Sequence, residues 1–170
     1  MHEFDVETAG PTDTTAIRDV VTAAFERDDE AILVDALRES PAYRPDLSFV
    51  ARHDGDVIGH VMFTEVALSD RETAELVLAP LSVSPEHQRS GVGSRLVRVG
   101  LDAARDAGYE LVFLHGDPDY YGRFGFTSAV DAGFENPFDM PDEAFQVYAL
   151  SEDSLADVGG ALTYPAPFRE

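Results

Sequence analysis

The sequence predicts an α/β (α+β) fold in which a mixed, mostly antiparallel sheet of about six to seven strands is flanked by about four helices. Helix-like segments near the N-terminus precede three strand-like runs, and strand and helix patterns then alternate to about residue 150. The 170 residues, 44% of them hydrophobic, suit one sizeable core. No repeat or linker-like stretch divides the sequence. We therefore expect one domain over residues 1–170, with a core at about 4–150 and a C-terminal strand or tail at 151–170.

The N-terminal part predicts a strand followed by two helices. The strand is expected around Phe4–Glu7, and Thr12 or Asp13 can cap the helix that follows it. Apolar residues recur on one face of this first helix: Ile17, Val20, Val21, Ala24 and Phe25. The second helix is predicted from the same spacing of Ile32, Leu33, Ala36 and Leu37, and "PAYRP" ends it.

Three strands are expected next. "LSFVAR" and "VIGHVMFTEVAL" are strand-like runs joined by a tight Asp-Gly turn, and "AELVLAPLSVS" adds a third strand. Pro80 has no N–H to donate to a neighbouring strand, so we expect a bulge or a separation of strands around residues 79–81. The backbone groups freed there can pair with an extended ligand that carries amides.

The later part alternates helices and strands. "GVGSRLVRVGLDAARDAG" predicts a helix whose apolar stripe contains Val92, Leu96, Val99 and Ala103, with Gly108 as its C-terminal cap. "YELVFLHG" predicts a short buried strand, and "FQVYALS" a late one. Between them, "DPDYYGRFGF" predicts a helix of one or two turns that Gly125 ends.

Composition excludes several kinds of chemistry. The chain has no cysteine, which removes disulfides, thiolate metal sites and a cysteine nucleophile. All twelve basic residues are arginine, so a Walker A loop, a protein kinase and a Schiff-base enzyme each lack the lysine that they need. The five histidines show no metal-ligand spacing, and we expect no metal.

The net charge of −21 limits the partners of the chain. Nucleic acid is a poor partner for such a surface, no apolar run is long enough to span a membrane, and the N-terminus lacks a secretory pattern. We therefore expect a cytoplasmic protein. An acidic patch for a polyamine or a basic protein tail is one interpretation of the charge. Because the acids are spread along the chain, we favour adaptation to a salt-rich cytoplasm and infer a halophilic, archaeal source.

The stretch "SPEHQRSGVGSRLV" joins the third central strand to a helix through a turn with two glycines. The first turn of a helix offers unpaired N–H groups and the positive end of the helix dipole, and Gly91 and Gly93 let a large anion approach. The spacing suits a pyrophosphate, although a plain strand-to-helix turn has the same pattern. Leu96 fills the third glycine position of a dinucleotide fingerprint. With the strand opened at Pro80, the turn suggests a site for coenzyme A.

"LAPLSVSPEHQRSGVGSRLV" resembles the acetyl-CoA-binding motif of the GNAT superfamily of N-acetyltransferases, and "YYGRFGF" resembles that family's short aromatic helix ending in Gly-Phe. The resemblance covers roughly residues 4–150 and implies a GNAT-like fold. It implies an N-acetyltransferase that uses acetyl-CoA as co-substrate and acetylates a small-molecule amine or a protein amino group. It is also compatible with a homodimer.

The resemblance assigns roles to residues of this chain. Strand backbone groups would contact pantetheine and the acyl carbonyl, and the turn would hold the pyrophosphate, with Gln88 shaping it. The implied cofactor-binding residues are Leu81, Ser82, Val83, Gln88, Arg89, Ser90, Gly91, Val92, Gly93 and Ser94. Tyr121 is the implied acid that protonates the leaving thiolate, with Tyr120 as the alternative. Arg89, Arg95 and Arg123 are candidates for contacts with the coenzyme phosphates.

The general base is left open by the sequence. Glu65 is placed where some relatives have a carboxylate near the acceptor amine, and it is our candidate catalytic base. His115, Asp117 and a water chain are the alternatives. With no cysteine available, the simplest route is direct attack of the amine on the acetyl group in a ternary complex. A non-catalytic acyl-CoA-binding domain and an enzyme for longer acyl-CoA donors are the competing interpretations.

Overall fold

The computed structural model describes residues 3–69, 73–137, 140–151, 154 and 159–169. Its eight-stranded sheet has the order β1-β2-β3-β4-β5-β7-β6, and β8 pairs with β3 outside that path. The α-helices are α1 (Thr14–Phe25), α2 (Asp29–Arg38), α3 (Val92–Asp106) and α4 (Pro118–Tyr121). The strands are β1 (Asp5–Thr8), β2 (Tyr43–His53), β3 (Asp56–Leu68), β4 (Glu75–Val83), β5 (Leu111–His115), β6 (Thr127–Ser128), β7 (Phe145–Ala149) and β8 (Leu162–Thr163).

The sheet is mixed and mostly antiparallel, as expected. Of the described strand pairs, only β4 with β5 is parallel. The two-residue strands β6 and β8 bring the total to eight, above the six to seven expected. A late segment of the chain also joins the sheet, because β8 pairs with Ala67 and Leu68 at the end of β3. No helix in the described ranges is long and apolar enough to cross a membrane.

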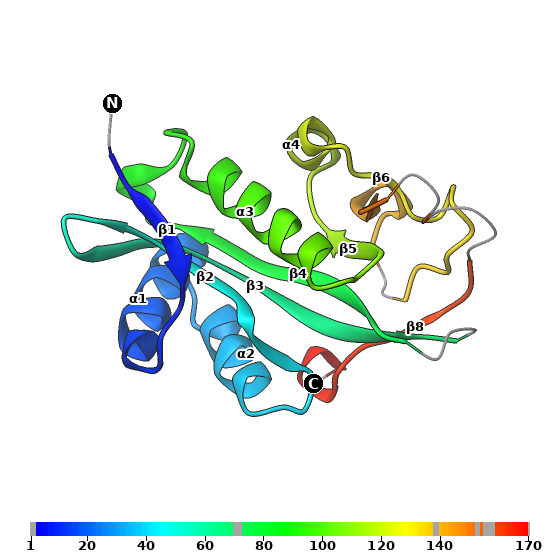
Figure 1. Ribbon diagram of the computed structural model, residues 1–170, viewed down its shortest axis with the longest axis horizontal. Coiled ribbons are helices and arrows are strands. Elements are labelled where there is room, and N and C mark those ends of the chain that lie inside the picture. The colour runs from blue at the N-terminus through cyan, green and yellow to red at the C-terminus, as the bar shows by residue number, and fades with distance from the viewer. Residues whose placement is uncertain (1–2, 70–72, 138–139, 152–153, 155–158, 170) are drawn as a thin grey trace.

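Helices cover both faces of the sheet. Figure 1 shows α1 and α2 on one face and α3 on the other. Because side chains alternate along a strand, Val61 and Phe63 of β3 pack with the α3 cluster, whereas Met62 packs with α1 and α2. Gly100 on α3 lies directly over Phe63, since a Cβ atom there would be 2.1 Å from the ring atom Cε1. This close approach brings α3 down onto the sheet.

The predicted faces of the two N-terminal helices need correction. In α1, Ile17, Val20 and Val21 are buried as expected, but Phe25 is 36% exposed because it ends the helix. In α2 the fully buried residues are Ala31, Val34 and Leu37. Leu33 is half-buried against the same cluster and Ala36 is half-buried, so the expected face is wrong only at Ile32. Ile32 is instead 60% exposed. Contact with the sheet centres the buried face of α2 on Ala31, Val34 and Leu37, which turns Ile32 outward.

The predicted turns are confirmed with small shifts in boundaries. The first strand begins one residue later than expected, at Asp5. Asp54 and Gly55 join β2 to β3 with φ angles of 51° and 85°, the left-handed pair that a tight hairpin turn requires. Gly108 follows α3 with a φ angle of 95°, and Gly125 ends the short helical segment after α4 with a φ angle of 107°.

The strands β4 and β5 separate beside Pro80, as the sequence predicted. Their register contains only the pairs Leu76–Val112 and Val77–Phe113, and the rest of β4 continues without β5. On its other edge, β4 stays paired with β3, with a register shift between the pairs that involve Val61 and Phe63. The separation leaves one edge of the second half of β4 open.

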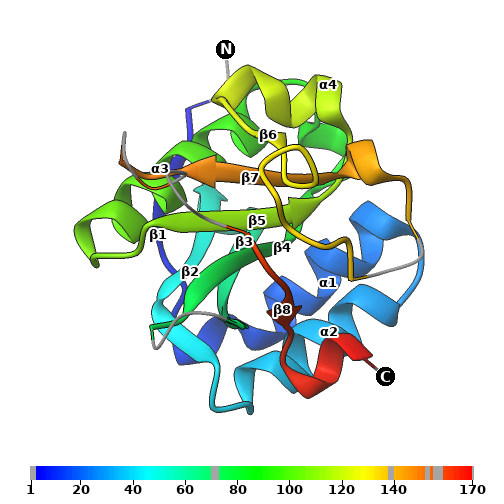
Figure 2. The same ribbon diagram turned by 90° about the vertical axis from the view of Figure 1, so that its right-hand side faces the viewer.

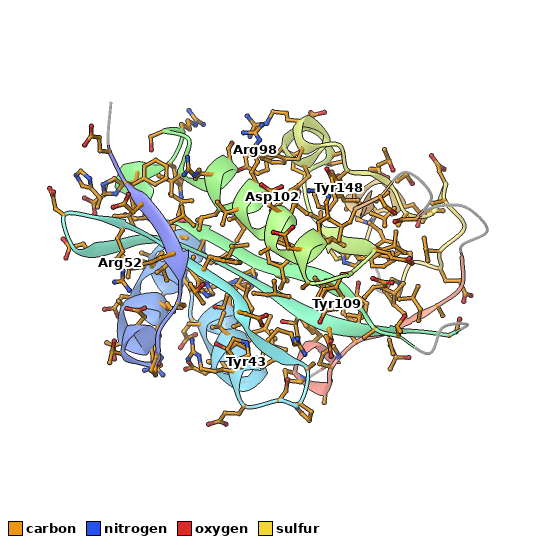
Figure 3. The ribbon with its side chains drawn as sticks, viewed as in Figure 1. Tyr43, Arg52, Arg98, Asp102, Tyr109 and Tyr148 are labelled. Atoms are coloured by element: carbon orange, nitrogen blue, oxygen red, sulfur yellow. The ribbon has the colours of Figure 1, made fainter. Side chains whose placement is uncertain are left out.

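Asp13 links the beginning of α1 to the sheet. It occupies the N-cap position, but its carboxylate accepts hydrogen bonds from the Gly10 N–H at 2.7 Å and from Arg52 at 2.6 and 2.7 Å. Arg52 also pairs with Glu7 of β1, and Figure 3 shows it close to β1 and α1. The Arg52 guanidinium, helped by Gly10, holds the pKa of Asp13 below its ordinary value despite burial.

We expect Asp13→Asn to lower the free energy of unfolding at pH 7 by about 1–3 kcal/mol, because Arg52 loses its buried charged partner. A lowered carboxyl pKa stabilises the fold above the unfolded pKa of about 4, and that stabilisation disappears as the pH falls through the folded pKa. The two proteins should therefore become equally stable in acid. Urea unfolding from pH 7 downward measures this.

Asp35→Asn is the matched control, since Asp35 is 34% exposed and its partners Arg18 and Arg38 are 51% and 23% exposed. An exposed pair of this kind contributes only about 0–1 kcal/mol. Equal losses in the two variants would contradict the role given to Asp13.

Candidate functional site

Two cavities meet where β4 has separated from β5. The first, which we call the cradle cavity, has a volume of about 610 Å³ and is lined by the end of β4, the glycine turn and the start of α3. The second, which we call the apolar cavity, has a volume of about 560 Å³ and extends from β4 to α2 and the C-terminal segment. Leu81 and Phe25 line both cavities, so these two residues mark the junction.

The glycine turn leads from β4 into α3 through two residues in the left-handed conformation. Arg89 and Gly91 have φ angles of 63° and 90°, and α3 begins directly after Gly91. The Arg95 N–H donates to the Gly91 carbonyl at 3.1 Å, so the amides before it belong to the first turn, which has no partners within the helix. The Gln88 side chain donates to the Val83 carbonyl at 3.0 Å and ties the turn back to β4.

Cationic and aromatic groups complete the cradle cavity. Arg89 and Arg123 line it, whereas Arg95 is not among its described lining residues. The Arg123 guanidinium lies 4.5 Å from the centre of the Tyr120 ring. Tyr120 in turn approaches Gly93 so closely that a Cβ atom there would be 2.6 Å from the tyrosine hydroxyl. In a chain with a net charge of −21, this is a local concentration of groups that bind an anion.

The open edge of β4 presents backbone donors beside the cradle cavity. The Ser84 N–H donates to the Ile58 carbonyl of β3 at 2.8 Å. Because successive N–H groups along a strand point to opposite edges, the Val83 N–H points away from β3, toward the gap left by β5. An extended ligand lying along this edge would find a donor there.

The structure brings most of the predicted cradle residues together. Seven of them line the cradle cavity: Leu81, Val83, Gln88, Arg89, Gly91, Gly93 and Ser94. The side chains of three others point elsewhere. Ser82 is buried at 2% exposure, Ser90 donates to the His87 carbonyl, and Val92 packs in the core. These three residues can contribute only backbone groups to the site.

The two neighbouring tyrosines face different cavities. Tyr120 lines the cradle cavity and Tyr121 the apolar cavity, with their rings 4.9 Å apart and almost perpendicular. The Tyr121 ring packs against Gly116, where a Cβ atom would be 2.6 Å from Cε2. Burial, together with Tyr120 and Asp117, raises the pKa of Tyr121, so its hydroxyl keeps its proton at neutral pH.

Of the candidate bases, His115 and Asp117 line the apolar cavity with Tyr121. The His115 ring stacks on Phe145 at 4.8 Å, and burial lowers its pKa below the ordinary value of 6.5 against an opposing hydrogen bond with Asn136. The imidazole is therefore unprotonated at neutral pH and able to accept a proton.

Glu65 is placed elsewhere. Its carboxylate accepts a hydrogen bond from the Tyr109 hydroxyl at 2.6 Å, and the Arg44 guanidinium is 3.9 Å away. Tyr109 lies near the C-terminal end of α3 (Figure 3), and Glu65 is not among the described residues that line either cavity. The structure therefore does not bring Glu65 together with Tyr121.

Sequence reasoning missed four residues of the site. Phe25 ends α1 and lines both cavities with Ala24 beside it in the cradle cavity, although both were assigned to the buried stripe. Tyr164 and Phe168 reach the apolar cavity from the C-terminal segment, which lies beside α2 in Figure 2. The aromatic, proline-rich composition of "LTYPAPF" was the only available signal for the last two.

Comparisons with known proteins agree with one another. The sequence profile described as "Acetyltransferase (GNAT) family" matches residues 14–126. The uncharacterized N-acetyltransferase YjhQ of Escherichia coli K12 is 40% identical over 146 residues, which are 84% of this chain and 81% of that protein. The uncharacterized N-acetyltransferase YhbS of the same strain is 36% identical over 159 residues, 93% of this chain and 94% of that protein.

Two solved structures share the fold. The crystal structure of E. coli YhbS in complex with CoA has a TM-score of 0.94 and 33% identity, and the match covers 100% of this chain and 94% of that one. A GNAT family acetyltransferase from Brucella melitensis in complex with acetyl-CoA has a TM-score of 0.81 and 35% identity, with 99% of both chains covered. These relatives lend no support to a halophilic archaeal source.

Proposed function

The chain belongs to the acetyltransferase (GNAT) family, and from that premise we propose that it moves an acetyl group from acetyl-CoA to an amine acceptor by direct attack in a ternary complex. The meeting of the two cavities at Leu81 carries this proposal. One cavity is suited to a polyanion and the other is lined mainly by apolar side chains. A ternary complex needs such a pair, with the reacting groups at the junction.

The residues of the cradle cavity fit the coenzyme. Its pyrophosphate would lie at the first turn of α3, against the amides of residues 89–94 and the guanidinium groups of Arg89 and Arg123. Its pantetheine arm would follow the open edge of β4 along residues 81–83, where the Val83 N–H points into the gap. This arrangement would place the thioester beside Leu81, between the cradle cavity and the apolar cavity.

The chain supplies the two proton transfers. The amine nitrogen bonds to the acetyl carbon, the bond from carbon to sulfur breaks, and the amine gives up a proton. Of the candidate bases, we assign that proton to His115 in place of Glu65, because His115 shares the apolar cavity with Tyr121. Tyr121 gives its proton to the departing thiolate. The Val83 N–H would stabilise the charge that develops on the acetyl oxygen.

We also propose a cellular setting for the protein, which its composition supports. With 33 acidic residues and no lysine, the chain suits a cytoplasmic protein in a salt-rich, halophilic cell, where close screening removes the self-repulsion of the surface. The same repulsion would oppose the binding of a polyanionic coenzyme at low salt. A homodimer stays an expectation from the family resemblance.

We expect saturable binding of acetyl-CoA by calorimetric titration in molar KCl, with NAD and ATP as controls that do not reproduce it. The affinity should be held or improved when the salt is raised from tenths of a molar to molar concentration, because screening weakens the repulsion between the coenzyme and the acidic surface. A folded protein that does not bind acetyl-CoA would overturn the proposed function. A steep loss of affinity with rising salt would overturn only the expectation that salt screens the repulsion between the coenzyme and the acidic surface.

Tyr121→Phe should lower kcat by about 10²-fold, because general acid catalysis contributes at least that much, while the Kd for acetyl-CoA stays near its original value. Tyr120→Phe is the matched control, since its hydroxyl belongs to the cradle cavity. Steady-state kinetics and calorimetry on both variants measure the difference. A loss of kcat in Tyr120→Phe alone would transfer the acid role to Tyr120.

His115→Gln should also lower kcat by about 10²-fold, because the amine loses its proton acceptor. In the original protein, kcat should fall with decreasing pH only below the ordinary imidazole pKa of 6.5, since burial lowers the pKa of His115. The variant should lose this acidic limb of the profile. His53→Gln, on the hairpin between β2 and β3, is the control. An unchanged profile in His115→Gln would remove His115 from the mechanism.

A further inference from the structure

The lining of the apolar cavity points to one class of acceptor. We propose that the acceptor is a primary amine on a compact apolar or aromatic body, without a carboxylate or phosphate group. This inference rests on the function proposed above and narrows it. It follows from three properties of the cavity: the chemistry of its walls, the sign of its charged groups and its position relative to the junction.

The walls of the cavity are mainly apolar. Phe25, Tyr121, Tyr164 and Phe168 supply aromatic surface, and Tyr164 and Phe168 pack edge to face with their ring centres 5.5 Å apart. Leucine, valine, methionine and proline side chains cover much of the remaining surface. A volume of about 560 Å³ lies in the range of small-molecule sites. Such walls favour an apolar body of the size of a phenyl ring with a short alkyl chain.

The charged groups in the lining are carboxylates. Glu30 and Asp117 are the only carboxylate side chains among the described lining residues, and no arginine is among them. Arg27 already pairs with Glu30 at 2.6 Å, so we expect the exposed carboxylate of Asp117 to supply most of the negative potential. A cavity with this charge attracts an ammonium group and repels a carboxylate or a phosphate. It therefore selects against free amino acids.

Asp117 lies near the two residues to which we assign proton transfer. Asp117 lies two residues after His115 and four before Tyr121. It caps α4 by accepting a hydrogen bond from the Asp119 N–H at 2.9 Å. The amine end of the acceptor would thus meet the carboxylate near the two groups to which we assign proton transfer. The apolar body would extend toward α2 and Phe168, away from the junction at Leu81.

The test compares four acceptors at fixed acetyl-CoA. They are 2-phenylethylamine, L-phenylalanine, spermidine and a short peptide with a free α-amino group. Released coenzyme thiol is measured with a thiol reagent, and the cysteine-free protein gives no background. We expect kcat/KM for 2-phenylethylamine to exceed each of the others by tenfold or more, since an unmatched carboxylate or a second ammonium group in an apolar site is unfavourable by at least about 1.4 kcal/mol.

Two variants test the lining itself. Phe168→Ala should raise KM for 2-phenylethylamine by roughly tenfold through lost apolar contact, with little change in the KM for acetyl-CoA. Asp117→Asn keeps the oxygen that caps α4 and should raise the same KM through lost attraction to the ammonium group. Phe4→Ala is the matched aromatic control, because Phe4 packs with the α3 cluster, away from the apolar cavity. Calorimetric binding of acetyl-CoA verifies that each variant is folded.

Other outcomes of these measurements would contradict either the acceptor class alone or the proposed function as well. Acetyl-CoA binding with preferred turnover of the amino acid, spermidine or the peptide overturns the acceptor class and leaves the proposed function standing. Faster turnover of butyryl-CoA than of acetyl-CoA, with Phe168→Ala affecting only the former, assigns the apolar cavity to a longer acyl chain and also overturns the inference. Absence of acetyl-CoA binding, or binding without acetylation of any amine, overturns the proposed function as well.

Discussion

The separation of β4 from β5 is the constraint on which the rest of the site depends. Parallel strands cannot be joined by a short turn, so the chain needs a long crossover connection, which is usually a helix. Here that helix is α3, which begins after the connection 84–91, and its first turn lines the same cavity as the end of β4. The open edge of β4 and the anion-binding end of α3 are therefore neighbours by topology. Pro80 and the two-pair register with β5 ensure that this edge is not filled by the sheet itself.

The parts of the site that were predicted from the sequence are those with local causes. The glycine turn, the interruption at Pro80 and the short helix before Gly125 each follow from the conformational limits of a few adjacent residues. The walls of the apolar cavity arise from contacts between α1, β4, β5 and the C-terminal segment. Which residues of α2 are fully buried, and where Phe168 lies, are decided by those distant contacts. Strand alternation alone also could not show that Glu65 faces Tyr109, 44 residues later.

Charge is distributed unevenly between the surface and the site. Several arginines pair with neighbouring acids, including Arg18 with Asp35, Arg52 with Asp13 and Arg105 with Asp102. Arg89 and Arg123 instead line the cradle cavity, and Arg123 lies over Tyr120. A strongly acidic chain can in this way keep a positive site, because pairing neutralises several of the other arginines and the helix dipole adds to the two that line the cavity.

One physical cause acts on both groups to which we assign proton transfer, His115 and Tyr121. His115 ends β5 and Tyr121 ends α4, so a span of seven residues places both in the apolar cavity. Removal from water disfavours charge, which raises the pKa of the tyrosine and lowers that of the histidine. At neutral pH the tyrosine therefore holds its proton, and the imidazole is neutral and able to accept a second proton, as an acid and a base in one reaction require. The same apolar walls that would bind the body of an amine thus set the protonation states needed to acetylate it.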